Sequence, residues 1–148
     1  VTGARISFLV GRPDVIAALH KLRSQIDFGM FLPIQKAAIA ALNGPLESVQ
    51  EQCNMYQERR DAAENGFREL GWDIKPSKAT FYLWLPVSKG MTSEEFVTVM
   101  LEKAHVVVPP GNGYGRCGEG YFRVALTKDV ETIKKAIQRM KDAGISYE

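Results

Sequence analysis

The sequence has little of several residue types, and each shortage excludes a class of protein. Its two cysteines and two histidines are too few for a disulfide framework and fit no metal-binding spacing. No apolar run approaches the roughly 20 residues that a membrane-spanning helix needs. A net charge of +2 is too small to argue for nucleic acid, which requires a clustered basic surface. We therefore expect no metal, nucleic acid or membrane partner, and a reducing cytoplasm as the compartment.

What the sequence does contain is typical of a globular domain. Its 148 residues are 45% hydrophobic and 24% charged, which is enough to bury a core. The chain opens on VTGARISFLVGR, where the apolar run Arg5 to Val10 predicts a buried strand with no leader before it. Because a domain rarely opens in the middle of a strand, we expect the chain to be the C-terminal piece of a longer polypeptide.

Apolar residues at helical spacing predict three helices in the first half. The first covers 13–25, and the second covers 34–44 after an irregular apolar segment. The third covers 45–70 and ends before Gly71, a candidate C-cap. Its buried face is expected to carry Val49, Cys53, Tyr56, Arg60, Ala63, Phe67 and Leu70.

The second half alternates short strands with helices, which predicts a compact α+β unit. The strands are expected at 79–87, 105–110 and 120–126. The sequence Thr92 to Glu95 matches a capping box that opens a helix, and a second amphipathic helix ends the chain. The inward-facing residues of these two helices are expected to be Phe96, Val97, Met100 and Leu101, then Val130, Ile133, Ile137 and Met140.

A glycine-rich stretch, GNGYGRCGEGYFR at 111–123, contains the spacing G-x-G-x-x-G of dinucleotide-binding loops. That reading requires a helix after the glycines, whose N-terminus faces the phosphate. A strand follows here instead, so the glycines are interpreted as a tight connection between strands. Arg123 lies within the apolar alternation of that strand. It either faces solvent or faces an anion, because a buried arginine needs a partner such as a carboxylate.

Two segments together resemble the pyridoxal-phosphate-dependent aminotransferases of fold type I, class I/II. The segment TGARISFLVG at 2–11 is similar to the end of the family pattern S-K-x-x-x-M-[ST]-G-x-R-x-G-[FY]. Val1 stands where Met is common, and Ser7 where glycine is frequent. The family's Schiff-base lysine, eight positions before the arginine, would lie just upstream of Val1. No catalytic residue is therefore expected within this chain.

The second segment, PPGNGYGRCGEGYFRVALT, resembles the family's C-terminal signature P-G-x-x-[FY]-G-x-x-G-x-G-[FY]-x-R-[IVL]-[AS]. FLPIQKAAIAAL is similar to the stretch that leads toward the inter-domain helix. TFYLWLPV resembles the first strand of the small domain, although Lys78-Ala79-Thr80 stands where a glycine is often seen. The resemblance covers essentially the whole chain, in order and spacing.

The resemblance implies an α/β fold with an α+β small domain. Residues 1–44 would form the C-terminal end of the large cofactor-binding domain, which is incomplete here. Residues 45–148 would form the connecting helix and the small C-terminal domain, with a short sheet covered by helices. Residues 29–33 resemble the segment that reaches the neighbouring subunit, so a homodimer is expected for the full-length protein.

The resemblance also implies the chemistry. Pyridoxal phosphate would serve as the electron sink for transferring an amino group between an amino acid and a 2-oxo acid. Arg5 would bind the cofactor phosphate, unless it caps its strand or pairs with an acid, and Arg123 would bind the substrate α-carboxylate. Tyr114 and Phe81 are weaker candidates for the substrate site, as an exposed loop residue and a core residue are the alternatives. The chain alone is expected to be inactive, and the amino donor stays open.

Two alternatives remain open from the sequence. Another fold-type I enzyme, such as an acyl-transferring synthase of the α-oxoamine type, has a similar small domain. A non-enzymatic α+β binding module would instead fold as a self-contained unit, whereas a fragment would expose apolar surface.

Overall fold

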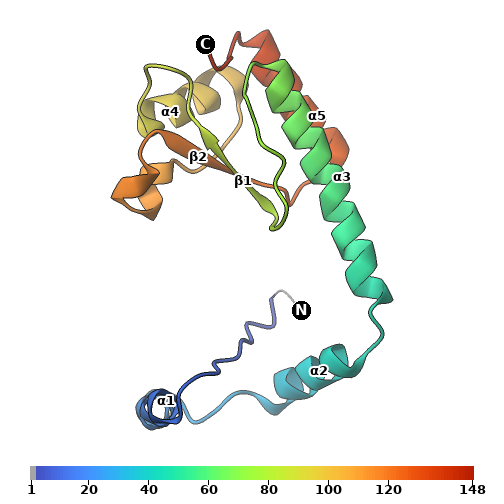
Figure 1. Cartoon of the computed structure of the whole chain (residues 1–148), viewed down its shortest axis with the longest axis vertical. Coiled ribbons are helices and arrows are strands. Elements are labelled where there is room, and N and C mark those ends of the chain that lie inside the picture. The colour runs from blue at the N-terminus through green and yellow to red at the C-terminus, as the bar shows by residue number, and fades with distance from the viewer. Residues whose placement is uncertain (1–2) are drawn as a thin grey trace. The chain divides into compact units, whose positions relative to one another are not determined.

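The computed structural model describes residues 3–148, and the chain divides into two compact units, the first ending at Ser48 and the second spanning Val49–Glu148 (Figure 1). The elements in chain order are α1 (Pro13–Ile26), α2 (Leu32–Asn43), α3 (Glu47–Glu69), β1 (Tyr82–Pro86), α4 (Ser93–Ala104), the short 3₁₀ helices η1 (Gly111–Tyr114) and η2 (Arg116–Gly118), β2 (Tyr121–Ala125) and α5 (Val130–Asp142). Among residues 3–148, no helix is both long enough and apolar enough to cross a membrane.

The first unit contains α1 and α2, which confirms the two helices predicted there. Each has a proline in its first turn, Pro13 and Pro33, where the missing backbone N–H needs no partner. The segment between them is irregular from Asp27 to Phe31, as predicted from Gly29, whereas Pro33, also expected to interrupt it, lies in the first turn of α2. Ala38 is the buried hydrophobic residue of this unit within the described part of the chain.

The strand predicted from Arg5 to Val10 is wrong. These residues form neither helix nor strand, and Arg5 has a left-handed φ of 55°. Phe8 is 70% exposed and Val10 is 90% exposed. A strand requires a hydrogen-bonding neighbour, and the described part of the first unit offers none. Val1 and Thr2, the other residues of the family pattern, lie outside the described residues.

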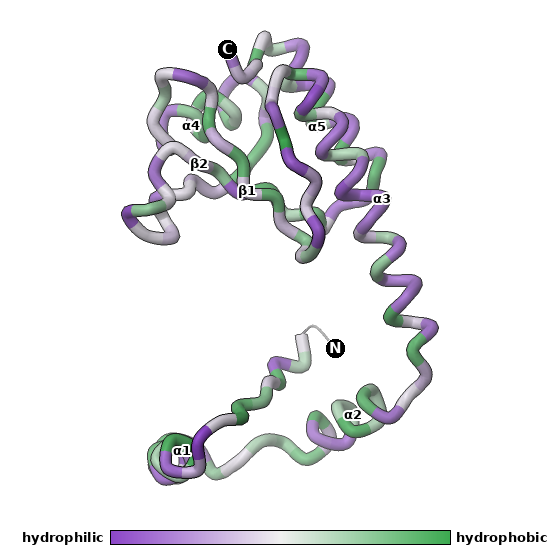
Figure 2. Tube along the Cα trace, viewed as in Figure 1, coloured by the Kyte–Doolittle hydropathy of each residue, from purple (hydrophilic) through white to green (hydrophobic). Residues whose placement is uncertain are grey.

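The second unit is built on a two-stranded antiparallel sheet, β1 beside β2. One face of the sheet contributes Leu83, Leu85 and Phe122 to the core, each at most 3% exposed. Helix α4 adds Phe96 and Met100, which are fully buried. Figure 2 shows the hydrophobic colouring of β1 against the mostly hydrophilic α3 and α5, which cover the unit on the outside. The sheet and its helices confirm the predicted α+β fold.

Helices α3 and α5 lie side by side in the second unit (Figure 1). A Cβ added at Gly66 would lie 2.6 Å from a side-chain carbon of Ile137, so the missing side chain allows this close packing. The predicted face of α3 is buried only in its C-terminal half, at Ala63 and Phe67, and Val49 is 54% exposed. Helix α5 has the predicted amphipathic character, with its buried residues Ile133 and Met140.

The capping box predicted at the start of α4 is present. Thr92 accepts from the backbone N–H of Glu95, and the Glu95 carboxylate accepts from the backbone N–H of Thr92. The bonds from the Thr92 backbone and side chain lower the pKa of Glu95 below its ordinary value, because they favour the charged form. Of the residues predicted to face inward, Leu101 does not, since it is 50% exposed.

The strand predicted at 105–110 is also wrong. His105 instead ends α4 in a left-handed conformation with φ 54°. Of the residues that follow, Val106 donates its N–H to the carbonyl of Met100 at 3.1 Å, Pro109 accepts from Arg123 N–H at 3.1 Å, and Pro110 forms an isolated bridge with Phe122. Two consecutive prolines lack backbone donors, so they cannot continue a hydrogen-bonded ladder.

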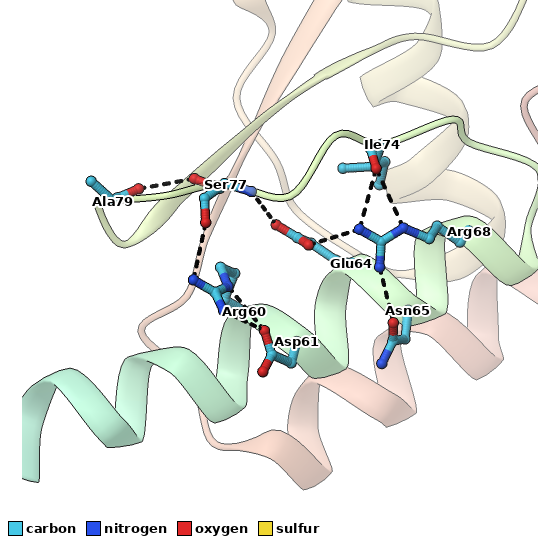
Figure 3. A network of polar contacts seen from close by, with 8 residues as sticks. All are labelled: Arg60, Asp61, Glu64, Asn65, Arg68, Ile74, Ser77 and Ala79. Atoms are coloured by element: carbon cyan, nitrogen blue, oxygen red, sulfur yellow. Dashed lines mark hydrogen bonds and ion pairs between the residues drawn. The ribbon is translucent and has the colours of Figure 1, made fainter.

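A polar network fixes the segment before β1 to α3 (Figure 3). Glu64 is 2% exposed and accepts from Ser77 N–H at 2.8 Å and from Arg68 Nη2 at 2.9 Å. Arg68 also donates to the carbonyl of Ile74 at 3.2 Å, and Arg60 donates to the carbonyl of Ser77 at 3.0 Å. A buried carboxylate with two donors is satisfied, so this network sets where the chain enters β1.

We expect Glu64→Ala to lower the free energy of unfolding by about 2–3 kcal/mol, because it leaves the Ser77 N–H and the Arg68 guanidinium without their acceptor. Glu69→Ala, on an exposed position of the same helix, should change it by less than about 0.5 kcal/mol. Urea unfolding followed by the fluorescence of buried Trp72 measures both. Equal effects of the two substitutions would contradict the role given to the network.

Candidate substrate-carboxylate site

Arg123 lies on the face of the sheet opposite the core. It is paired with Trp84 across the strands, and residues directly opposite share a face, so both point away from Leu83 and Phe122. The Arg123 side chain is half-buried. Sequence reasoning left open whether it faces solvent or an anion, and its surroundings bear on that choice.

The surroundings of Arg123 are aromatic. Its guanidinium carbon lies 4.2 Å from the ring centroid of Tyr82 and 4.7 Å from that of Tyr114. Its Nε is buried and has no hydrogen-bond partner among residues 3–148. No ion pair within the described chain includes Arg123. A half-buried cation without an acidic partner and with an unused donor has the chemistry to bind an anion.

The two weaker candidates differ in their relation to this arginine. Tyr114, at the end of η1, is 52% exposed and contacts the guanidinium. Phe81 is 40% exposed and instead packs against Tyr56, with ring centroids 5.6 Å apart, and against Tyr82 at 4.4 Å. The structure thus brings Tyr114 to Arg123. Phe81, the residue before Tyr82, lies instead beside Tyr56 of α3. Tyr82, which the sequence analysis did not select, is the ring that lies nearer to the arginine.

The glycines before β2 form a compact double turn. Gly111 of η1 and Gly118 of η2 are in backbone contact, since a Cβ added to either would lie 2.1 Å or 2.0 Å from the other's carbonyl oxygen. Gly115 between them has φ 120°, a region that favours glycine. The loop is tightly turned as expected and leads into β2, not into an α-helix, but the residues before it form no strand, so it does not connect two strands.

The start of α4 holds this loop in place. Ser93 is fully buried, and its Oγ accepts from the backbone N–H groups of Gly120 and Tyr121 at 2.9 Å and 3.2 Å. Glu119 in turn accepts from Ser93 N–H at 2.8 Å. Sequence reasoning assigned no site role to these two residues. Their only signal is the position of Ser93 just after the N-cap, because the loop partner lies 25 or more residues away.

Thr80 has a backbone conformation that is typical of glycine. It stands in the Lys78-Ala79-Thr80 stretch, where the family often has a glycine, and its φ is 71°. Such a value is unusual for a β-branched residue. The backbone therefore keeps a conformation suited to glycine just before Phe81, although the glycine itself is absent.

Arg5 lies in the first of the two units. Its side chain is exposed and forms no ion pair with another residue of 3–148. A guanidinium with all its donors available suits a phosphate, which accepts at two points. The donor sets of Arg5 and Arg123 thus fit a phosphorylated cofactor and a carboxylate respectively. His20 and His105 are both exposed, and residues 3–148 contain no cluster of three or more potential metal ligands.

Comparisons with known proteins identify longer relatives. A family model described as "Aminotransferase class I and II" matches residues 1–140. LL-diaminopimelate aminotransferase 2 of Trichormus variabilis is 52% identical over 147 residues, covering 99% of this chain and 38% of that protein. LL-diaminopimelate aminotransferase of Moorella thermoacetica is 51% identical over 141 residues, covering 95% and 36%.

Comparison of the fold with solved structures also finds an aminotransferase. An aminotransferase structure from Staphylococcus aureus superimposes with a TM-score of 0.88 at 32% identity, covering 99% of this chain and 39% of that one. The chain therefore spans between a third and two fifths of the length of the proteins it resembles.

We expect Gly111→Ala to destabilise the second unit by at least about 2 kcal/mol, because the new methyl group would overlap a backbone oxygen that cannot rotate away. Gly113→Ala is the matched control in the same loop. A Cβ added at Gly113 has no neighbouring atom within 4 Å, so the free energy of unfolding should change by less than about 0.5 kcal/mol. Thermal unfolding by circular dichroism measures both. If the two variants melt alike, the close approach of Gly111 and Gly118 is not a constraint on the loop.

Proposed function

Because this chain belongs to the class I and II aminotransferase family and corresponds to a C-terminal portion of its members, we propose that the full-length protein transfers an amino group between an amino acid and a 2-oxo acid. The observation that carries the proposal is Arg123, a half-buried cation that has neither an acidic partner nor a hydrogen-bond partner for its Nε among residues 3–148. Pyridoxal phosphate, when bound, supplies the electron sink that stabilises the carbanion at the substrate Cα.

Arg5 binds the cofactor phosphate in this proposal. A permanently charged guanidinium with a fork of N–H donors neutralises a dianion at two points. The exposure of Arg5 in this chain supports the assignment, because no other group of the described residues competes for its donors. The lysine that holds the cofactor lies eight positions before Arg5 in the family pattern. The 148 residues alone are therefore inactive.

Arg123 orients the substrate. A carboxylate that accepts from two guanidinium N–H groups is fixed in the plane of the guanidinium, and this fixes the direction of the Cα–H bond. Without an acid of its own, Arg123 keeps its full charge for the ligand. Phe81 packs against Tyr56 and Tyr82 and would contact the substrate only beyond the carboxylate.

The amino donor we propose is LL-diaminopimelate or a close analogue, because the relatives from Trichormus variabilis and Moorella thermoacetica carry that name at 52% and 51% identity. These names also favour amino transfer over the acyl transfer of an α-oxoamine synthase. The exposed apolar side chains of the first unit, such as Phe28 at 108%, support a chain that further polypeptide covers, and not a self-contained binding module. In this proposal the full-length protein is a homodimer, and its compartment is the cytoplasm.

We expect Arg123→Gln in the full-length protein to lower kcat/KM for the amino donor by about 100- to 10,000-fold, because two hydrogen bonds to a charged group are lost at about 1.5–3 kcal/mol each. Arg123→Lys should lie between, since it keeps the charge and loses the fork. Arg116→Gln removes an exposed arginine of the same loop and serves as the control. Steady-state kinetics measures all three. If Arg123→Gln stays within threefold of the wild type while cofactor is bound, the assignment fails.

The donor is tested by the half-reaction. Full-length protein loaded with cofactor is mixed with LL-diaminopimelate, alanine or aspartate, and the change in cofactor absorbance is followed. We expect LL-diaminopimelate to react with the highest second-order rate constant. Faster reaction with alanine or aspartate would reject this donor without rejecting amino transfer.

A further inference from the structure

The side chain of Arg123 is held in place by its neighbours and not by an ion pair within the described chain. An arginine that waits for a ligand carboxylate must be fixed, since a mobile side chain loses rotamer entropy when it binds. Pairing with an acidic residue would fix it but would also neutralise it and occupy its donors. Within residues 3–148, Arg123 has no such acid.

Two tyrosine rings take that place. The guanidinium carbon lies 4.2 Å from the Tyr82 centroid and 4.7 Å from the Tyr114 centroid, well inside the roughly 6 Å range of cation–π contacts. The face of an aromatic ring attracts the cation but takes up no N–H donor in the guanidinium plane. The buried Nε of Arg123 has no hydrogen-bond partner among residues 3–148. The rings therefore hold the cation and leave its donors unused.

Both rings are themselves held by the fold. Tyr82 belongs to β1 and is the diagonal neighbour of Arg123 in the sheet, two residues before Trp84, a separation that aromatic side chains span. Trp84 packs edge-on against Tyr114 with centroids 5.7 Å apart. The loop that carries Tyr114 is fixed by the contact of Gly111 with Gly118.

We propose that Tyr82 and Tyr114 are positioning residues that clamp Arg123 through their ring faces and thereby orient it for the substrate carboxylate without neutralising it. The proposal rests on the proposed function, because it assigns the carboxylate to Arg123. It gives Tyr114 a role through the arginine and adds Tyr82 as its partner. The ring face, and not the phenol oxygen, carries this role.

The clamp is tested in the full-length protein with cofactor bound, by titrating propionate as a minimal carboxylate and following the cofactor absorbance. Tyr82→Leu and Tyr114→Leu should each weaken propionate binding and raise KM for the amino donor by about 3- to 30-fold, with a smaller change in kcat. Tyr82→Phe and Tyr114→Phe keep the ring face and should stay within about twofold of the wild type. Tyr121→Leu is the matched control. Tyr121 belongs to β2, the strand of Arg123, and its ring stacks on Trp84 with centroids 5.8 Å apart. Within the described chain it makes no cation–π contact with Arg123.

The outcomes separate the clamp from the function on which it rests. If Arg123→Gln loses propionate binding and the leucine variants do not, the clamp is overturned and the carboxylate site stands. If Arg123→Gln itself binds propionate normally, the proposed function of Arg123 fails and the clamp fails with it. Phenylalanine variants as weak as the leucine variants, or a Tyr121→Leu as weak as Tyr82→Leu, would also overturn the clamp. Since Tyr114 is 52% exposed, its variants test the clamp even if Tyr82→Leu does not fold.

Discussion

The structure of the second unit depends on a half-buried cation, Arg123, that forms no ion pair with any acid among residues 3–148. Arg123 is half-buried, faces away from the core beside Trp84, and has a buried donor that no described residue satisfies. Leaving such a group unpaired costs free energy, so the surrounding structure must stabilise the arrangement. A ligand carboxylate would offset this cost, which is why the unsatisfied donor supports the proposed binding role of Arg123.

The remaining elements of the unit can be understood as support for this arginine. The core face of the sheet, with Leu83 and Phe122 packed on α4, fixes the strand that carries it. The buried Ser93 ties the start of α4 to the end of the glycine loop. On the other side, the buried Glu64 ties α3 to the segment that enters β1. Two of these supports come from α4 and one from α3, so the position of the guanidinium depends on the whole unit and not on its own strand.

The sequence was sufficient for local structure and for motifs, and less so for long-range pairing. The capping box at Thr92 and the amphipathic α5 follow from patterns within one helical segment, and the structure confirms them. The strands predicted at Arg5–Val10 and at 105–110 are absent, because an extended apolar run forms a strand only where a partner with free donors and acceptors lies beside it. Arg123 could be selected from its motif, whereas Tyr82 could not, since its role depends on the register that places it diagonally across the sheet.

The most direct measurement is a crystal structure of the full-length protein with an amino-acid substrate or its analogue bound. The account predicts that a ligand carboxylate oxygen lies about 2.7–2.9 Å from a guanidinium nitrogen of Arg123, the range of charge-assisted bonds, with the rings of Tyr82 and Tyr114 still against the guanidinium. A carboxylate of the protein paired with Arg123, or a substrate carboxylate bound elsewhere, would contradict the central claim that this arginine is kept uncompensated for its ligand.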